Sequence, residues 1–167
     1  MNRNRLTLFG VLAALIVLGA DQASKWWVLD YLHLSTQRPK EINQYFNLTL
    51  VWNPGVTFGL LNGLGQWSHF ILAAIAMAVV AALCVWLRRS ESALVALSIG
   101  AIAGGAVGNV IDRLRFGAVV DFLHAHVDTI WGDLSWYVFN VADAAIVCGV
   151  VILAIDSQWP RAPKSPP

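Results

Sequence analysis

The chain has 167 residues, of which 57% are hydrophobic and 13% are charged. Soluble domains carry about 25% charged residues, so this composition argues against a soluble domain and indicates an integral membrane protein. The formal net charge of +1 gives no reason to expect nucleic acid as a partner. Both cysteines, Cys84 and Cys148, lie within apolar runs, which predicts packing residues rather than a disulfide.

Four apolar runs are long enough to cross a bilayer, which takes about 20 residues per helix. They cover about residues 6–27, 67–87, 93–111 and 138–155. The first run follows two arginines, as in a signal peptide, but it is longer than a signal-peptide core and three more spans follow it. We therefore expect an uncleaved first helix and a multi-pass membrane protein.

The positively charged residues in short loops indicate the orientation of the spans. One side of the membrane would hold Arg3, Arg5, Arg88, Arg89, Arg161 and Lys164. The other side would hold Lys25, Arg38, Lys40, Arg113 and Arg115. The first side has a small excess of positively charged residues, which predicts that this side is cytoplasmic. Because it holds both ends of the chain, we expect both termini to be cytoplasmic.

Two extracytoplasmic segments remain, at about 28–66 and 112–137. In the first, residues 46–52 alternate between apolar and mostly polar side chains, which predicts a strand with one apolar face. That strand ends at the turn signal Asn53-Pro54-Gly55. The second segment carries most of the ionisable groups. The tail 157–167 is rich in proline, and we expect it to be disordered and cytoplasmic.

Glycines recur every four residues in the third span, at Gly100, Gly104 and Gly108, and Asp112 continues the row. Small residues at this spacing predict a close helix–helix seam in a membrane. The adjacent row ends in Asn109 and Arg113, so the seam would bring polar groups to one face at the extracytoplasmic end of the helix. In the first span, Asp21 and Lys25 are spaced for an ion pair that anchors the helix.

Asp143 lies in the apolar fourth span, where a carboxylate costs a few kcal/mol to insert. Asn140 is three residues earlier, and Asp121 follows the third span within an apolar stretch. We expect Asp121 and Asp143 to meet just below the outer membrane surface. Two close carboxylates share one proton, so one can activate water while the other polarises a peptide carbonyl. This pair predicts peptide-bond hydrolysis without a metal or a covalent intermediate.

Two other functions use the same acidic residues. Asp112, Asp121 and Asp143 could form the relay of a small proton-coupled transporter, although these groups cluster at one end of the predicted bundle. The pattern Asp121-x-x-His124-x-His126-x-Asp128 contains metal-ligand residue types, but HExxH is absent and the match is loose. Solvent-facing histidines explain that pattern better.

Five sequence blocks together resemble the bacterial lipoprotein signal peptidase family (signal peptidase II). They are Asp21-Gln22-Ala23-Ser24-Lys25, Asn53-Pro54-Gly55-Val56-Thr57-Phe58-Gly59, Gly108-Asn109-Val110-Ile111-Asp112-Arg113, Gly117-Ala118-Val119-Val120-Asp121-Phe122 and Phe139-Asn140-Val141-Ala142-Asp143. The blocks occur in order within about residues 6–155, and the last three are highly specific in combination.

The resemblance implies an aspartic endopeptidase of the bacterial inner membrane, with its active site near the extracytoplasmic face and no cofactor. Such an enzyme removes the signal peptide of prolipoproteins by cutting before a cysteine that carries a diacylglyceryl group. Asp121 and Asp143 would be the catalytic dyad. Residues that shape the site or hold the substrate would be Asn53, Gly55, Asn109, Arg113, Asn140 and Ala142. Residues that support it would be Asp21, Lys25, Gly108 and Asp112.

The resemblance also implies a single domain over 1–167, a four-transmembrane-helix bundle with a small extracytoplasmic β-sheet cradle and a short extracytoplasmic helix or loop. The family's sheet cradles the substrate and matches the strand expected within 42–60. Implied partners are diacylglyceryl prolipoproteins, membrane lipids and inhibitors of the globomycin type, and we expect a monomer.

One block departs from the family pattern. The family usually has two alanines before the phenylalanine, where this chain has Val56 and Thr57. The larger side chains would alter the local cradle surface and with it inhibitor affinity.

Overall fold

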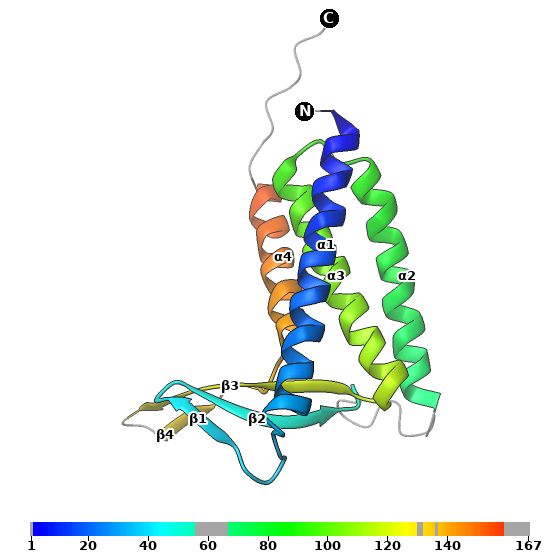
Figure 1. Ribbon diagram of the computed structural model, residues 1–167. Helices are drawn as coiled ribbons and strands as arrows, with labels where there is room; N and C mark the ends of the chain where they lie inside the picture. The colour runs from blue at the N-terminus through cyan, green and yellow to red at the C-terminus, as the bar shows by residue number, and fades with distance from the viewer. Residues whose placement is uncertain (1, 56–66, 130–131, 136, 159–167) are drawn as a thin grey trace, which may run out of the picture.

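Four long helices stand side by side, and a small antiparallel sheet runs across one end of them (Figure 1). This computed structural model describes residues 2–55, 67–129, 132–135 and 137–158. The helices are α1 (Arg3–Trp26), which continues as a π-helical turn (Trp27–Tyr31), α2 (Ser68–Arg88), α3 (Ala93–Phe116) and α4 (Val141–Gln158). All four are long and apolar enough to cross a membrane, which confirms the predicted four-span class.

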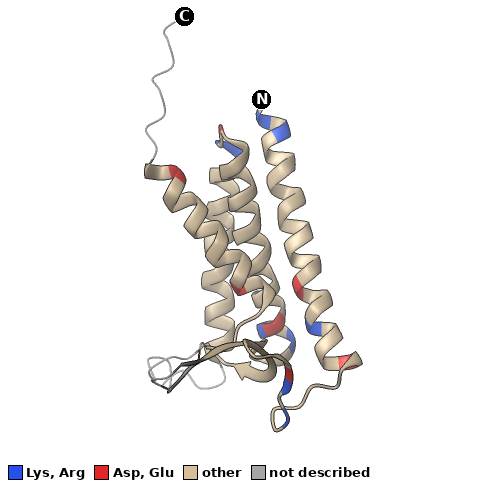
Figure 2. Ribbon diagram, turned by 90° about the vertical axis from the view of Figure 1, so that its left-hand side faces the viewer, with Lys and Arg blue, Asp and Glu red and all other residues tan. Residues whose placement is uncertain are grey.

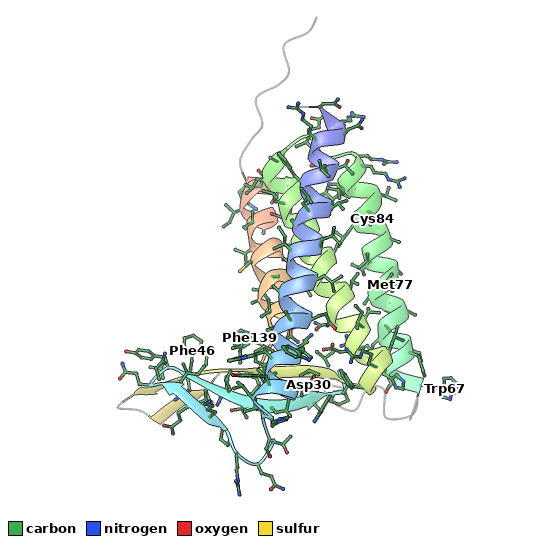
Figure 3. All side chains as sticks on the ribbon, viewed as in Figure 1. Asp30, Phe46, Trp67, Met77, Cys84 and Phe139 are labelled. Atoms are coloured by element: carbon green, nitrogen blue, oxygen red, sulfur yellow. The ribbon has the colours of Figure 1, made fainter. Side chains whose placement is uncertain are left out.

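The exterior of the bundle is apolar, as expected of a surface in contact with lipid. Leu15, Ile16 and Val147 are each at least 59% exposed. Charged residues lie at the two ends of the bundle and in a band close to the sheet, with an uncharged stretch between them (Figure 2). Cys84 projects from the outer side of α2 (Figure 3), and both cysteines are exposed and free. They form no disulfide, as the sequence predicts, but the prediction that they are packing residues is wrong because both lie on the exposed surface of the helices.

α3 is the central helix, because α1, α2 and α4 each pack against it. A Cβ atom added at Gly100 would overlap the carbonyl of Gly10 in α1, and one at Gly104 would overlap the carbonyl of Ala14. The backbones of α1 and α3 therefore touch along the glycine row, which confirms the predicted seam. Apolar side chains of Leu6, Leu87, Val95, Ala96 and Ile99 fill the end of the bundle remote from the sheet.

α3 is longer than its apolar run. The run ends at residue 111, but the helix continues to Phe116 and ends at Gly117, which adopts φ +74° and donates its N–H to the carbonyl of Arg113 at 3.0 Å. Glycine takes this left-handed conformation without a steric penalty. Asp112 and Arg113 are therefore held by the helix rather than by a loop.

The sheet has the order β1 (Lys40–Asn43), β2 (Phe46–Asn53), β3 (Val119–Thr129) and β4 (Gly132–Ser135), with all neighbours antiparallel. The strand predicted at 46–52 is β2. The segment 112–137, which we expected to form a short helix or loop, instead supplies the end of α3 and two strands. At 119–123 apolar residues occupy both faces of β3, so the alternation that marks a strand appears only over residues 123–128.

A second difference concerns the start of α4. The apolar run begins at Val138, but the helix begins at Val141. Phe139 instead pairs with Leu123 of β3 through two backbone hydrogen bonds of 2.8 and 2.9 Å. Figure 3 shows Phe139 beside the sheet. This bridge places the first turn of α4 directly beside Asp121. Val56, Thr57 and the tail beyond residue 158 lie outside the described residues.

Candidate active site

Asp121 lies on β3, opposite Val51 of β2, and is 1% exposed. Its Oδ2 accepts a hydrogen bond from Asn53 Nδ2 at 2.9 Å, and its Oδ1 accepts one from Asn140 Nδ2 at 2.7 Å. The pKa of Asp121 is raised to about 6, chiefly by burial and also by the neighbouring charge of Asp143, and it is this high although the two amide donors and Lys25 lower it. Asp121 is therefore a carboxyl group that keeps its proton to a higher pH than an ordinary aspartate, up to about pH 6.

Asp143 lies in the first turn of α4 and is partly buried. Its Oδ1 accepts a hydrogen bond from Asn109 Nδ2 at 2.8 Å, and its Oδ2 accepts one from the backbone N–H of Asn140 at 3.3 Å. The backbone N–H of Asp143 in turn donates to Asn140 Oδ1 at 2.9 Å. This reciprocal pair is a capping box, the arrangement that satisfies free amides at a helix start. The carboxylate also sits at the positive end of the helix dipole.

The structure thus brings together the two carboxylates that the sequence singled out. Asp121 comes from the sheet, Asp143 from α4, and Asn140 is hydrogen-bonded to both. Asn109 reaches Asp143 from α3, and its own Oδ1 accepts from Asn140 Nδ2 at 3.2 Å. A pair of carboxyl groups held in this way can share one proton, which general acid–base hydrolysis requires.

Lys25 forms a buried ionic cluster beneath this pair. Its ammonium group lies 2.8 Å from Asp21 Oδ2 and 2.7 Å from Asp112 Oδ2, and it donates to Asn109 Oδ1 at 3.2 Å. The side chain of Lys25 is 4% exposed, and those of the two acids are 1% exposed or less. The predicted ion pair between Asp21 and Lys25 is confirmed, and Asp112 joins it.

The acids of this cluster also hold backbone amides next to the dyad. Asp21 Oδ1 accepts the N–H of Ala142 at 3.0 Å, and Asp112 Oδ2 accepts the N–H of Val120 at 3.1 Å. Each of these amides belongs to the residue immediately before a dyad aspartate. Gly108 provides the space, because a Cβ atom there would overlap Asp21 Oδ2. The cluster therefore fixes the backbone on both sides of the site.

Gln22 belongs to the same cluster and was not predicted from the sequence. Its Nε2 lies 3.2 Å from Asp21 Oδ2 and 3.1 Å from Asp112 Oδ1, so it joins the two acids that Lys25 also joins. A single glutamine beside an aspartate carries no periodic or compositional signal. Only the packing of α1 on α3 identifies its role.

Arg113 and Gly55 are in contact at the edge of the site. Gly55 has φ +73°, and a Cβ atom there would lie 3.1 Å from Arg113 Nη2 and closer still to Leu72. Asn53 Oδ1 accepts the N–H of Gly55 at 2.8 Å, so Asn53 holds both this turn and Asp121. Arg113 Nη1 donates to the carbonyl of Asn109 at 3.3 Å, while its buried Nε has no hydrogen-bond partner among the described residues.

The two histidines of the loose metal pattern lie on β3, further along the strand than Asp121. Their rings are stacked with centroids 5.6 Å apart, and His124 Nε2 is 2.6 Å from the hydroxyl of Ser135. Within the described ranges, the acids, histidines and cysteines form no group of three or more that could hold a metal ion. The arrangement around Asp121 and Asp143 offers amide and guanidinium donors, which suit carboxylates and peptide carbonyls.

Comparison with known proteins shows the family of this chain. The family model described as signal peptidase (SPase) II matches residues 13–159. The chain belongs to the signal peptidase II family. It is 48% identical to the lipoprotein signal peptidase of Methylorubrum extorquens (strain PA1), over 94% of this chain and 89% of that protein. It is 43% identical to that of Rhodopseudomonas palustris (strain TIE-1), over 89% of this chain and 90% of that protein.

A solved structure shares the fold of this signal peptidase II family member. It is described as a bacterial membrane enzyme structure solved by the in meso method at 1.9 Å resolution, with a TM-score of 0.74 and 26% identity over 91% of this chain and 94% of the other. The resemblance seen in the sequence is confirmed, and the chain is a multi-pass membrane peptidase. These findings do not favour the proton-coupled transporter. The roles of individual site residues stay predictions.

Proposed function

We propose that this protein is an aspartic endopeptidase that removes signal peptides from prolipoproteins. It would cut before the diacylglyceryl-modified cysteine at the outer face of the bacterial inner membrane. The observation that carries this proposal is the pair Asp121 and Asp143, brought from the sheet and from α4 to the same residue, Asn140, which donates to one through its side chain and to the other through its backbone N–H. The chemistry requires one proton shared by the pair.

The two carboxyl groups suit different steps. Asp143 accepts hydrogen bonds from Asn109 and from a helix-start amide, which suits a carboxylate that takes a proton from the attacking water. Burial raises the pKa of Asp121 to about 6, so this group keeps its proton up to about that pH. A protonated carboxyl group suits hydrogen bonding to the scissile carbonyl. Water adds to the carbonyl carbon, and the proton taken by Asp143 then passes to the leaving amine as the C–N bond breaks.

The position of the site suits a lipid-anchored substrate. β3 and the start of α4, which carry the dyad, lie at the sheet end of the helix bundle (Figure 1), whose helices expose apolar side chains. Diacylglyceryl chains in the outer leaflet would hold a scissile bond at this depth, and the signal peptide would lie along the apolar helices. We expect Asn53, Gly55 and Arg113 to border the substrate backbone. Ala142, which the sequence suggested for the same role, is fully buried with its N–H bonded to Asp21, so we expect it to hold Asp143 in place instead.

The test is cleavage of a diacylated prolipoprotein, followed as a shift in gel mobility. Asp121→Asn and Asp143→Asn should each reduce cleavage by at least about 1,000-fold, because one carboxyl group cannot take a proton from water and polarise the scissile carbonyl at the same time. Both variants should still reach the membrane. A globomycin-type inhibitor should block the wild-type protein, and a chelator should leave it active. Near wild-type cleavage by either variant would refute the dyad, and loss of activity with the chelator, restored by zinc, would favour metal chemistry.

A further inference from the structure

Asn140 lies between the two carboxyl groups and is itself fully buried, with 0% exposure. Its Oδ1 accepts the backbone N–H of Asp143 at 2.9 Å, and its Nδ2 donates to Asp121 Oδ1 at 2.7 Å. The side-chain amide of Asn140 therefore binds both aspartates. Its oxygen binds the backbone N–H of Asp143, and its nitrogen binds the carboxyl group of Asp121.

The orientation of this amide is fixed by its neighbours. The nitrogen faces three acceptors within 3.3 Å, namely Asp121 Oδ1, Asn109 Oδ1 and the carbonyl of Val120. If the amide were turned over, its oxygen would face these three oxygens, and its NH₂ group would face the N–H of Asp143. An amide oxygen only accepts and the NH₂ group only donates, so the reversed orientation would lose every one of these bonds.

We propose that Asn140 is a positioning residue with two separable roles in the dyad. Its amide oxygen fixes the start of α4 and thereby Asp143, and its amide nitrogen favours the ionised form of Asp121. Which of the two aspartates holds the shared proton then depends on this one side chain. This inference rests on the proposed function.

The second role follows from the charges around Asp121. Asp143 faces it from α4 and disfavours its ionised form, as burial does, whereas Lys25 of α1 and the nearby Arg113 of α3 favour that form. Asp112 of α3 is already paired with Lys25. Of the two donors on the Asp121 carboxyl group, Asn53 is the partly exposed one and Asn140 the buried one. Removing the Asn140 donor should raise the pKa of Asp121 beyond its value of about 6.

Serine and alanine substitutions separate the two roles. A serine hydroxyl caps a helix about as well as asparagine, so Asn140→Ser keeps the acceptor for the N–H of Asp143. Its side chain is too short to replace the amide donor to Asp121. Asn140→Ala removes the cap and the donor together. Asn140→Thr provides a second variant that keeps the cap if the serine variant is poorly folded.

The experiment measures kcat, KM, the pH profile of kcat/KM and the melting temperature for these variants. Asn140→Ser should lower kcat about 10- to 100-fold, change KM less than about threefold, and move the basic limb of the profile up by about one pH unit, since one unit corresponds to the loss of one charge-assisted hydrogen bond. Its melting temperature should stay near that of the wild type. Asn140→Ala should show the same pH shift together with a lower melting temperature. Asn2→Ala removes the cap of α1 at the far end and should leave the pH profile unchanged.

A readout that does not need activity is the carboxyl C=O band of Asp121 in infrared difference spectra, identified by its loss in Asp121→Asn. This band should persist to higher pH in Asn140→Ser than in the wild type. A wild-type pH profile and band in the serine variant would overturn the inference, even with both aspartate variants inactive. Cleavage by the aspartate variants would instead overturn the proposed function.

Discussion

Lys25 is the cation on which the buried acids of the site depend. It lies within 2.8 Å of both Asp21 and Asp112, and those acids hold the amides of Ala142 and Val120. A buried ion pair contributes little net stability compared with apolar residues, but removal of one partner leaves an uncompensated buried charge. The cluster is thus more important for fixing geometry than for the net free energy of folding.

We therefore expect Lys25→Met to lower the free energy of unfolding by about 3–5 kcal/mol, although methionine fills a similar volume. Thermal unfolding of the purified protein in detergent measures this loss. Lys40→Met is the matched control, because Lys40 is exposed on β1 and its substitution should change stability by less than about 0.5 kcal/mol. Equal stability of the two variants would show that the cluster is solvated.

The raised pKa of Asp121 leads us to expect that activity depends on pH. Its pKa is raised to about 6, so the protonated form is present below that pH and is lost above it. If Asp121 is the proton-bearing partner, kcat/KM should fall as the pH rises through about 6. Asn53→Ala removes a donor that lowers this pKa, so the basic limb should move to higher pH. A shift to lower pH would assign the basic limb to another group.

At the scale of the elements, the start of α4 and the α1–α3 seam hold the site together. Asn140 precedes α4 as its capping residue, so Asp143 is placed by helix geometry rather than by a flexible loop. The glycine row brings α1 close enough to α3 for Asp21 to lie against Gly108. Both features make the position of the dyad depend on close packing of backbone.

Substitution of glycine by alanine tests the seam with a control in the same helix pair. A Cβ atom at Gly104 would overlap the carbonyl of Ala14, whereas at Gly19 nothing lies within 4 Å. Gly104→Ala should lower stability by about 1–3 kcal/mol and reduce activity as Asp21 moves away. Gly19→Ala should be neutral or stabilise by about 0.5–1 kcal/mol, since alanine favours helices. Melting temperatures measure the difference, and a neutral Gly104→Ala would show that α1 and α3 are less closely packed.

The sequence predicted the helices and strands correctly where one hydrophobic pattern dominates a segment. Four long apolar runs predicted four helices, and the alternation at 46–52 predicted β2. The predictions for the end of α3, for the start of α4 and for the segment that forms β3 were wrong, for physical reasons. Hydropathy records where apolar residues stop, whereas Gly117 and the capping residue Asn140 decide where the helices end and begin. The first part of β3, residues 119–123, has apolar side chains on both faces because it is buried by its neighbours, so no alternation marks it in the sequence.

At the scale of the whole molecule, the sheet and the start of α4, which carry the dyad, lie at the end of the bundle opposite the first turn of α1 (Figure 1). We propose that the sheet end is extracytoplasmic and that both termini are cytoplasmic. The test starts from a variant in which alanine replaces Cys84 and Cys148. In spheroplasts of cells that carry this variant, a membrane-impermeant thiol reagent should label Ser35→Cys. It should label Ser157→Cys only after permeabilisation. The reverse result would place the dyad on the cytoplasmic side.

The sequence by itself determined the class of protein and the number of spans, and it singled out the two aspartates that the structure brings to Asn140. These follow from composition, run length and the order of short motifs, all of which are local along the chain. Only the tertiary structure decided how the aspartates are held. Asp21 reaches Ala142 across 121 positions of sequence, and Asn140 reaches Asp121 across 19. Such bonds depend on which faces of the helices pack together and on the bridge between Phe139 and Leu123, and no spacing of residues along the chain encodes either.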